Sequence, residues 1–268
     1  MKIFCISLNP DHLDLIKELN YLPVGLGKSK FSDEWYQDNS GINISQKNPY
    51  YGEYTFHYWL WRNNKIQINN WIGFCQYRKF WKKPNITPDL IEFKKFKNSI
   101  LKEIPKNFEN FDAILVDEIF INKFKLSKFI KHNLNTMIKN PQFFFNKNKR
   151  NIKFHFDMWH GEGNLDRAID KLPIKERSDF REFVNINTSF NPQNMFICKN
   201  KDTLFSYYES LFPWLLDCEK IFGFKNSNNY GLKRIYGFLA ERYLSYWFKK
   251  YKKISTLPFI FKDLSDYL

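Results

Sequence analysis

The sequence predicts an α/β fold in which helices flank a mostly parallel mixed sheet. An unbroken apolar run from Trp71 to Cys75 is typical of a strand covered on both faces, as in a parallel sheet. Similar short runs stand at Lys2 to Ser7 and at Met195 to Cys198. Hydrophobic residues make up 43% of the 268 residues and aromatic residues 19%, which is enough to build a substantial core.

The segment from Asn48 to Asn63 predicts a buried helix. We expect Asn48 to cap this helix and Pro49 to occupy its first position, where no backbone donor is needed. Glu53 and His57 recur four residues apart on one face, and aromatic residues line another. A helix that is aromatic nearly all round is covered on most sides.

Polar residues follow directly after the strand that ends at Cys75. On a strand, Gln76 and Arg78 project from one face and Tyr77 from the other, with Lys79 just beyond. Ligands of open α/β sheets bind at the carboxyl ends of strands, and Arg and Lys placed there suit an anion such as phosphate. The alternative is structural, with Arg78 pairing with a core carboxylate.

The first predicted strand, Lys2 to Ser7, is followed by Asn9, where a nucleotide-binding α/β domain would begin its site. We expect a short helix from Leu13 to Leu19 and then a strand from Tyr21 to Gly25, at a sheet edge because it contains Pro23. No complete G-x-G-x-x-G or Walker A sequence occurs. The usual dinucleotide and P-loop sites are therefore excluded.

The second half of the chain offers two polar clusters. The stretch from His155 to Glu162 gathers two histidines and two carboxylates, which we expect in a loop that binds a polar substrate, holds a metal or is merely structured surface. Its spacing matches no standard zinc signature. The turn that contains Asn194 suits sugar hydroxyls, and it equally suits an ordinary turn.

Carboxylates also stand in apolar surroundings. Glu241 shares a face with Phe238 and Leu244 on the final predicted helix, so it must pair with a cation, such as Arg78 or Arg242, or have a raised pKa. Asp117 and Glu118 interrupt an apolar run, which indicates a strand end or bulge. Metal ligation or a catalytic base is the alternative for these two.

The formal net charge of +14 favours an anionic partner, whether nucleic acid, a membrane surface or a nucleotide-linked substrate. A basic amphipathic pattern from Lys125 to Met137 suits an anionic lipid surface, or equally a core-packed helix with a solvated face. Four cysteines without C-x-x-C spacing fit a reducing compartment. We expect no signal peptide and no membrane-spanning segment.

Four stretches, ISQKNPYYGEYTFHYWLWRN, GFCQYRKFW, NPQNMFICKN and GFLAERYLSYWF, resemble a bacterial glycosyltransferase family catalogued as domain of unknown function 4422 and found in capsule and exopolysaccharide clusters. The resemblance runs from about Asp38 to Lys249. It implies a single GT-A-like domain over residues 1–268. Residues 1–120 would form a Rossmann-like, nucleotide-sugar-binding half, and residues 121–268 an acceptor-binding and C-terminal helical half.

The resemblance also implies roles for particular residues. Many GT-A enzymes hold a divalent metal with D-x-D at the strand end where this chain has Gln76-Tyr77-Arg78. We therefore expect no obligatory cofactor, with Mn²⁺ or Mg²⁺ as the alternative, and assign Arg78 to the leaving diphosphate. Glu241 is the leading candidate for the base, ahead of Asp157, Glu162 and Asp117. The expected donor-binding residues are Ser7, Asn9, Asn48, Glu53, Gln76, Tyr77, Arg78 and Lys79, and the expected acceptor-binding residues are Asp157, His160, Glu162 and Asn194.

The function implied by the resemblance is transfer of a sugar from a nucleotide-sugar donor to a growing capsular or other surface polysaccharide. The acceptor would be a glycan or a lipid-linked glycan, and no nucleic acid is expected. The protein would be cytoplasmic, with peripheral contact at the cytoplasmic face of the inner membrane. Two alternatives stay open: a non-catalytic binding module for nucleic acid or an anionic polymer, and a sugar-phosphate transferase.

Overall fold

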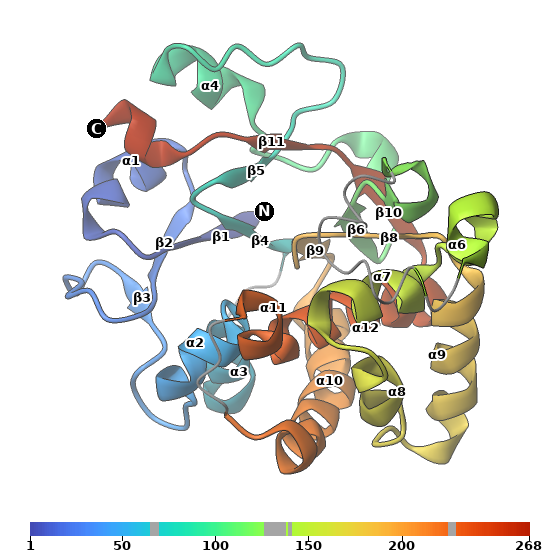
Figure 1. Ribbon diagram of the computed structural model, residues 1–268. Coiled ribbons are helices and arrows are strands. Elements are labelled where there is room, and N and C mark those ends of the chain that lie inside the picture. The colour runs from blue at the N-terminus through green and yellow to red at the C-terminus, as the bar shows by residue number, and fades with distance from the viewer. Residues whose placement is uncertain (65–69, 126–137, 139–140, 225–228) are drawn as a thin grey trace. The chain divides into compact units, whose positions relative to one another are not determined.

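A computed structural model describes residues 1–64, 70–125, 138, 141–224 and 229–268 (Figure 1). The chain divides into two compact units. Unit 1 consists of Met1–Asp117, Met195–Glu209 and Phe248–Leu268, and unit 2 consists of Glu118–Asn194 and Ser210–Trp247. Two of the boundaries, after Glu209 and after Trp247, fall within long helices, α10 (Lys201–Phe222) and α12 (Ile235–Tyr251).

Unit 1 contains the main sheet, whose strands run in the order β10-β6-β9-β4-β1-β2-β3. In the part of the chain that the structure describes, four of the six neighbouring pairs along this path are parallel, and both antiparallel pairs involve β9. The predicted α/β class with a mostly parallel mixed sheet is confirmed. The strands are β1 (Lys2–Ser7), β2 (Leu22–Gly25), β3 (Tyr36–Gln37), β4 (Ile72–Gln76), β5 (Lys79–Trp81), β6 (Ala113–Val116), β9 (Phe196–Cys198), β10 (Ile254–Leu257) and β11 (Phe259–Phe261), with β5 pairing both β4 and β11.

Helices cover both faces of this sheet (Figure 1). On one face, Phe4 of β1, Phe74 of β4 and Phe196 of β9 form a row of rings that meets helix α3 (Tyr54–Asn63). On the other face, Ile3, Cys75 and Ile197 belong to one core cluster with Ile16 of α1 (Leu13–Glu18) and Phe96 of α4 (Phe93–Ser99). The alternation of strand side chains thus builds two apolar layers.

The predicted helix from Asn48 to Asn63 is divided at Gly52, whose φ of 60° favours glycine. The two parts are α2 (Asn48–Tyr51) and α3. The prediction that Asn48 caps the helix is wrong, because Asn48 lies inside α2 and its amide donates to Gly52 O (3.0 Å) and Thr55 Oγ1 (3.3 Å). Asn48 therefore ties the two short helices together.

His57 lies in the core of unit 1, against the middle of β4. Its Nδ1 is 2.5 Å from the hydroxyl of Tyr208 in α10, and its ring lies 4.3 Å from that of Phe74. Complete burial lowers the pKa of His57 from its ordinary 6.5 to about 3, so the imidazole is neutral.

Unit 2 is mainly helical and has its own aromatic core, in which Phe180 contacts Trp214, Tyr243 and Tyr246. Besides its parts of α10 and α12, its elements are β7 (Ile119–Phe120) paired with β8 (Ser189–Phe190), α6 (Gln142–Phe145), α7 (Ile152–His160), α8 (Asn164–Ile169), α9 (Ile174–Ile186) and α11 (Tyr230–Lys233).

The loop predicted from His155 to Glu162 is wrong, because most of it belongs to α7. Asn151 caps this helix by accepting a hydrogen bond from the Phe154 N–H (2.8 Å), and Gly161 ends it with a φ of 93°. The histidines of this stretch are therefore held on a rigid element.

Three further expectations can be compared with the fold. Asp117 and Glu118 lie between β6 and β7, so the predicted strand end is confirmed, and Glu118 accepts from Ser189 Oγ at 2.7 Å. The strand containing Pro23, β2, is not the edge strand of the sheet, because β3 pairs beyond it. That pairing involves Val24 and Gly25 only, so Pro23 itself has no partner in β3.

The pattern predicted to contact a membrane lies in residues 126–137, outside the described residues. None of the described helices combines the length and apolarity needed to cross a bilayer.

The buried neutral His57 makes unit 1 sensitive to acid. Its pKa in the folded state is below its value in the unfolded state, so the free energy of unfolding falls once the pH drops below 6.5 and levels off near 3. Between about pH 7 and about pH 5, we expect the free energy of unfolding to fall by about 2 kcal/mol less in His57→Phe than in the wild type, as measured by urea unfolding. The double variant His57→Phe, Tyr208→Phe, which removes both hydrogen-bond partners, serves as the control. If the free energy of unfolding depended on pH in the same way in the wild type and in both variants, this expectation would be contradicted.

Candidate active site

The carboxyl ends of β1 and β4 form the first part of the site. These strands are adjacent and parallel, with Ile6 opposite Gln76, and Tyr77 N–H donates to Ile6 O at 2.9 Å. From β1 the chain continues to β2 on one side of it, whereas β4 lies on the other side. Such a switch point leaves a crevice at the strand ends where ligands of α/β sheets bind.

Ser7 and Asn9 stand at the end of β1 as expected, in a network that also contains His12. Asn9 N–H donates to Ser7 Oγ (3.0 Å), and Ser7 Oγ lies 2.9 Å from His12 Nδ1. The other ring nitrogen of His12 is 3.0 Å from Ser265 Oγ. Burial lowers the pKa of His12 below its ordinary value, which favours the neutral ring. Sequence reasoning missed His12, because a lone histidine carries no signature and only the fold brings Ser265 to it.

Arg78 lies at the end of β4 with its side chain half exposed (51%). Its Nε donates to Asp263 Oδ2 at 2.7 Å, and its guanidinium lies 4.8 Å from the centre of the Tyr77 ring. The alternative of a core carboxylate as partner is wrong, because Asp263 is not in the core. Although burial raises the pKa of Asp263, hydrogen bonds from Ser265 and Arg78 hold it below its ordinary value, so the pair is ionised.

The C-terminal segment fixes this strand end from the side. Lys262 N–H donates to Arg78 O (3.0 Å) and Leu264 N–H donates to Tyr77 O (3.1 Å). Asp263 also caps the short helix that follows by accepting from Ser265 N–H at 3.0 Å. The backbone at Tyr77 and Arg78 is therefore held by β1 on one side and by the C-terminal segment on the other. These hydrogen bonds fix the backbone from which the Arg78 side chain projects.

Three of the other residues expected to bind the donor, Glu53, Gln76 and Lys79, form a connected polar chain. The Gln76 amide donates to Glu53 Oε1 and accepts from Lys79 Nζ, each at 3.3 Å. Because a guanidinium and an ammonium have no lone pairs to donate, Arg78 and Lys79 do not fit a divalent metal at this strand end. Among the described residues, no group of three or more His, Cys, Asp or Glu side chains is arranged to hold one.

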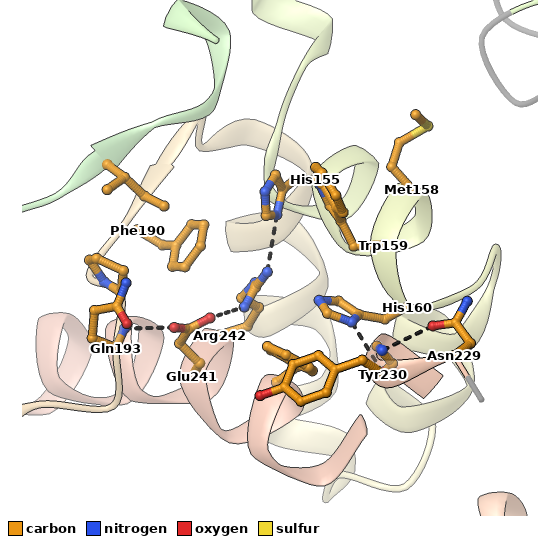
Figure 2. A pocket seen from close by; sticks show the side chains of 14 residues that line it. His155, Met158, Trp159, His160, Phe190, Gln193, Asn229, Tyr230, Glu241 and Arg242 are labelled. Atoms are coloured by element: carbon orange, nitrogen blue, oxygen red, sulfur yellow. Dashed lines mark hydrogen bonds and ion pairs between the residues drawn. The ribbon is translucent and has the colours of Figure 1, made fainter. Parts of the chain in front are cut away.

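Unit 2 contains a pocket of about 530 Å³ between α7, the turn after β8, α11 and α12 (Figure 2). Glu241 of α12 lines it with its side chain 12% exposed. One carboxylate oxygen accepts from Gln193 N–H at 2.6 Å, and the other forms an ion pair with Arg242. The expectation that Glu241 pairs with a cation is thus met by Arg242.

Arg242 lies almost wholly buried beneath this pocket. Its Nη2 is 3.0 Å from His155 Nδ1, and its guanidinium lies 4.2 Å from the centre of the Phe190 ring. Burial lowers the pKa of Arg242, but an arginine stays protonated in proteins. The ion pair with Glu241 compensates this buried charge.

The turn after β8 is tied to α12 by side-chain hydrogen bonds. Asn191 N–H donates to Ser245 Oγ (2.6 Å), which donates in turn to Asn191 Oδ1 (2.9 Å). Gln193 and Asn194 both have positive φ angles, of 78° and 53°. The Asn194 amide donates to Gly237 O at 3.4 Å, and Asn194 is not among the residues that line the pocket. This hydrogen bond ties Asn194 to the backbone of α12.

Of the other residues expected to bind the acceptor, His160 lines the pocket. Its Nδ1 lies 3.2 Å from Gly231 O, and its ring stacks on Phe238 with centres 4.0 Å apart. Asp157 instead pairs with Lys153 at 2.5 Å, and burial raises the pKa of its carboxyl. Glu162 is exposed in the turn after α7. The fold therefore brings His160 and Glu241 together and leaves Asp157 and Glu162 outside the lining.

Two comparisons place this chain among known proteins. The family model described as "Domain of unknown function (DUF4422)" matches residues 9–253. A structure of WbbM, described as a bifunctional glycosyltransferase in its apo form, superposes with a TM-score of 0.64 at 20% identity, covering 97% of this chain and 45% of that one. At this identity the likeness shows the fold, and this chain spans less than half the length of WbbM. No curated protein matches. Because the family model spans most of its length, the chain belongs to the DUF4422 family, as the sequence motifs predict.

Proposed function

We propose that this protein is a glycosyltransferase that moves a sugar from a nucleotide-sugar donor to a glycan acceptor. The observation that carries the proposal is the half-exposed Arg78, oriented by Asp263 at the carboxyl ends of β1 and β4. Membership of the DUF4422 family and a fold like that of a bifunctional glycosyltransferase support it. We further propose a role in building a capsular or other surface polysaccharide, with peripheral contact at the cytoplasmic membrane face and a glycan or lipid-linked glycan as acceptor.

The donor would bind in unit 1 with its diphosphate at Arg78. During transfer the bond between the sugar and the diphosphate breaks, and the nucleoside diphosphate leaves with an added negative charge. A guanidinium that is already oriented stabilises this charge without reorganisation, and Lys79 adds a second positive charge. Ser7, Asn9 and Tyr77 stand at the same strand ends, and Asn48, Glu53 and Gln76 are proposed to complete the donor site.

The acceptor would bind in unit 2, where Glu241 is the proposed base. As the acceptor hydroxyl forms its bond to the sugar, its proton passes to the Glu241 carboxylate. The Gln193 N–H and Arg242 hold this carboxylate in one orientation. Of the other residues expected at the acceptor, His160 lines the same pocket.

The first test removes the proposed diphosphate ligand. We expect Arg78→Ala to abolish turnover and the stabilisation by UDP-, GDP-, CMP- or dTDP-sugars in a thermal-shift screen, because ligand binding raises stability by mass action. Arg62→Ala, which removes an exposed arginine of α3, is the matched control and should behave like the wild type. Each donor is tested with Mn²⁺ and with EDTA. Turnover by a folded Arg78→Ala protein would refute the assignment, and tight oligonucleotide binding without any donor effect would favour the binding module.

A second variant tests whether Asp263 orients Arg78. We expect Asp263→Asn to keep donor binding but to lower kcat by roughly tenfold, with little change in melting temperature, because an exposed ion pair stabilises the fold by about 1 kcal/mol at most. Asp266→Asn, which removes a carboxylate paired with Lys262 in the same segment, is the control. An unchanged kcat in Asp263→Asn would show that the ion pair does not contribute to turnover.

A third variant tests the base. We expect Glu241→Gln to abolish transfer while the donor still stabilises the protein, because the proposed donor site lies in unit 1. The substitution leaves the buried Arg242 without its counter-ion and is expected to cost about 3 kcal/mol or more in stability. Donor-induced stabilisation therefore reports that unit 1 of the variant is folded, and circular dichroism reports on the helices of unit 2. Wild-type transfer rates in this variant would exclude Glu241 as the base.

A further inference from the structure

The pocket of unit 2 has an aromatic wall. Trp159 of α7, Phe190 of β8, Tyr230 of α11 and Phe238 of α12 all line it, and Figure 2 shows Trp159 and Tyr230 on opposite sides. Its volume of about 530 Å³ falls in the range of small-molecule sites. Aromatic faces suit a ligand that presents C–H groups on a flat side, as a sugar ring does.

The charges in this pocket compensate one another. Among the described residues that line it, Glu241 and Arg242 are the only ones with a formal charge, and they are paired with each other. The guanidinium of Arg242 also contacts His155 through Nη2, so its positive charge is already engaged. A phosphate or a carboxylate entering here would be desolvated without gaining a new counter-ion. The pocket thus differs from the strand ends of unit 1, where the positive charge of Arg78 is half exposed.

Two neutral histidines add hydrogen-bonding groups of opposite kind. Arg242 can only donate, so His155 Nδ1 accepts and its proton lies on Nε2. The Gly231 carbonyl can only accept, so His160 Nδ1 donates and its Nε2 holds a lone pair. Burial, reinforced by the charge of Arg242, keeps the pKa of each well below 6.5. The pocket therefore offers one imidazole donor and one imidazole acceptor, and a sugar hydroxyl can match either.

We propose that this pocket binds an uncharged sugar ring of the acceptor, with the ring stacked on Tyr230 and Trp159 and its hydroxyls hydrogen-bonded to His155 and His160. The inference rests on the proposed transferase function and deepens it by naming a neutral glycan as the acceptor class. Arg242 acts as a positioning residue, because it holds both the Glu241 carboxylate and the tautomer of His155.

The test is saturation-transfer difference NMR on the full chain with methyl glycosides of glucose, galactose, mannose and N-acetylglucosamine, and with methyl glucuronide as the charged probe. We expect at least one neutral glycoside to receive saturation at its ring protons and to bind more tightly than the glucuronide. Tyr230 is 62% exposed, so Tyr230→Ala should leave the fold intact yet weaken this binding roughly tenfold. Tyr230→Phe keeps the ring and should bind like the wild type.

Phe145→Ala is the matched control, because Phe145 is 89% exposed and does not line the pocket. It should bind like the wild type. The inference is overturned if no neutral glycoside binds, if binding is unaffected by Tyr230→Ala, or if the glucuronide binds more tightly.

A thermal shift with nucleotide sugars on the same preparation separates this inference from the proposed function. A donor effect that depends on Arg78, without glycoside binding, would overturn the pocket assignment alone. Glycoside binding that depends on Tyr230, without any donor effect, would support the pocket assignment and overturn the transferase proposal.

Discussion

The parallel pairing of β1 with β4 is the constraint on which the candidate donor site depends. Its register sets Phe4 beside Phe74 on the face covered by α3, and in the same step it brings the residues after Ile6 and Gln76 to one edge. A slip of one residue would turn the ring of the slipped strand, either Phe4 beside Phe56 or Phe74 beside His57, away from α3 and out of this layer. The apolar layer therefore determines where the polar strand ends meet.

The two units differ in how far their key arginine is buried. In unit 1, Arg78 is half exposed and paired with a carboxylate near the surface, so its charge still attracts an anion. In unit 2, Arg242 is buried, paired with Glu241 and bonded to His155, so its charge is compensated within the protein. This difference follows from burial, and it matches a charged donor in one unit and an uncharged sugar in the other.

Local sequence was informative where one element carries the whole signal. The strand Lys2–Ser7 was predicted with its observed bounds, and the strand after Trp71 within one residue, because a buried strand needs an apolar run. The proposed anion-binding role of Arg78 was inferred in the same way from its place after a strand. The helix α7 was missed because His155, Asp157 and His160 interrupt its apolar pattern, and the capping by Asn151 was overlooked.

By itself, the sequence determined the fold class, the family and the end of the strand that precedes Arg78. Apolar runs and motifs lie within contiguous stretches, so they can be recognised without the fold. Only the tertiary structure decided which partners these residues have. Asp263 reaches Arg78 and Ser265 reaches His12 from the opposite end of the chain, and the pocket combines α7, α11 and α12. Hydrogen bonds and charge pairing act over a few ångströms in space, whatever the separation along the chain, so no local pattern records them.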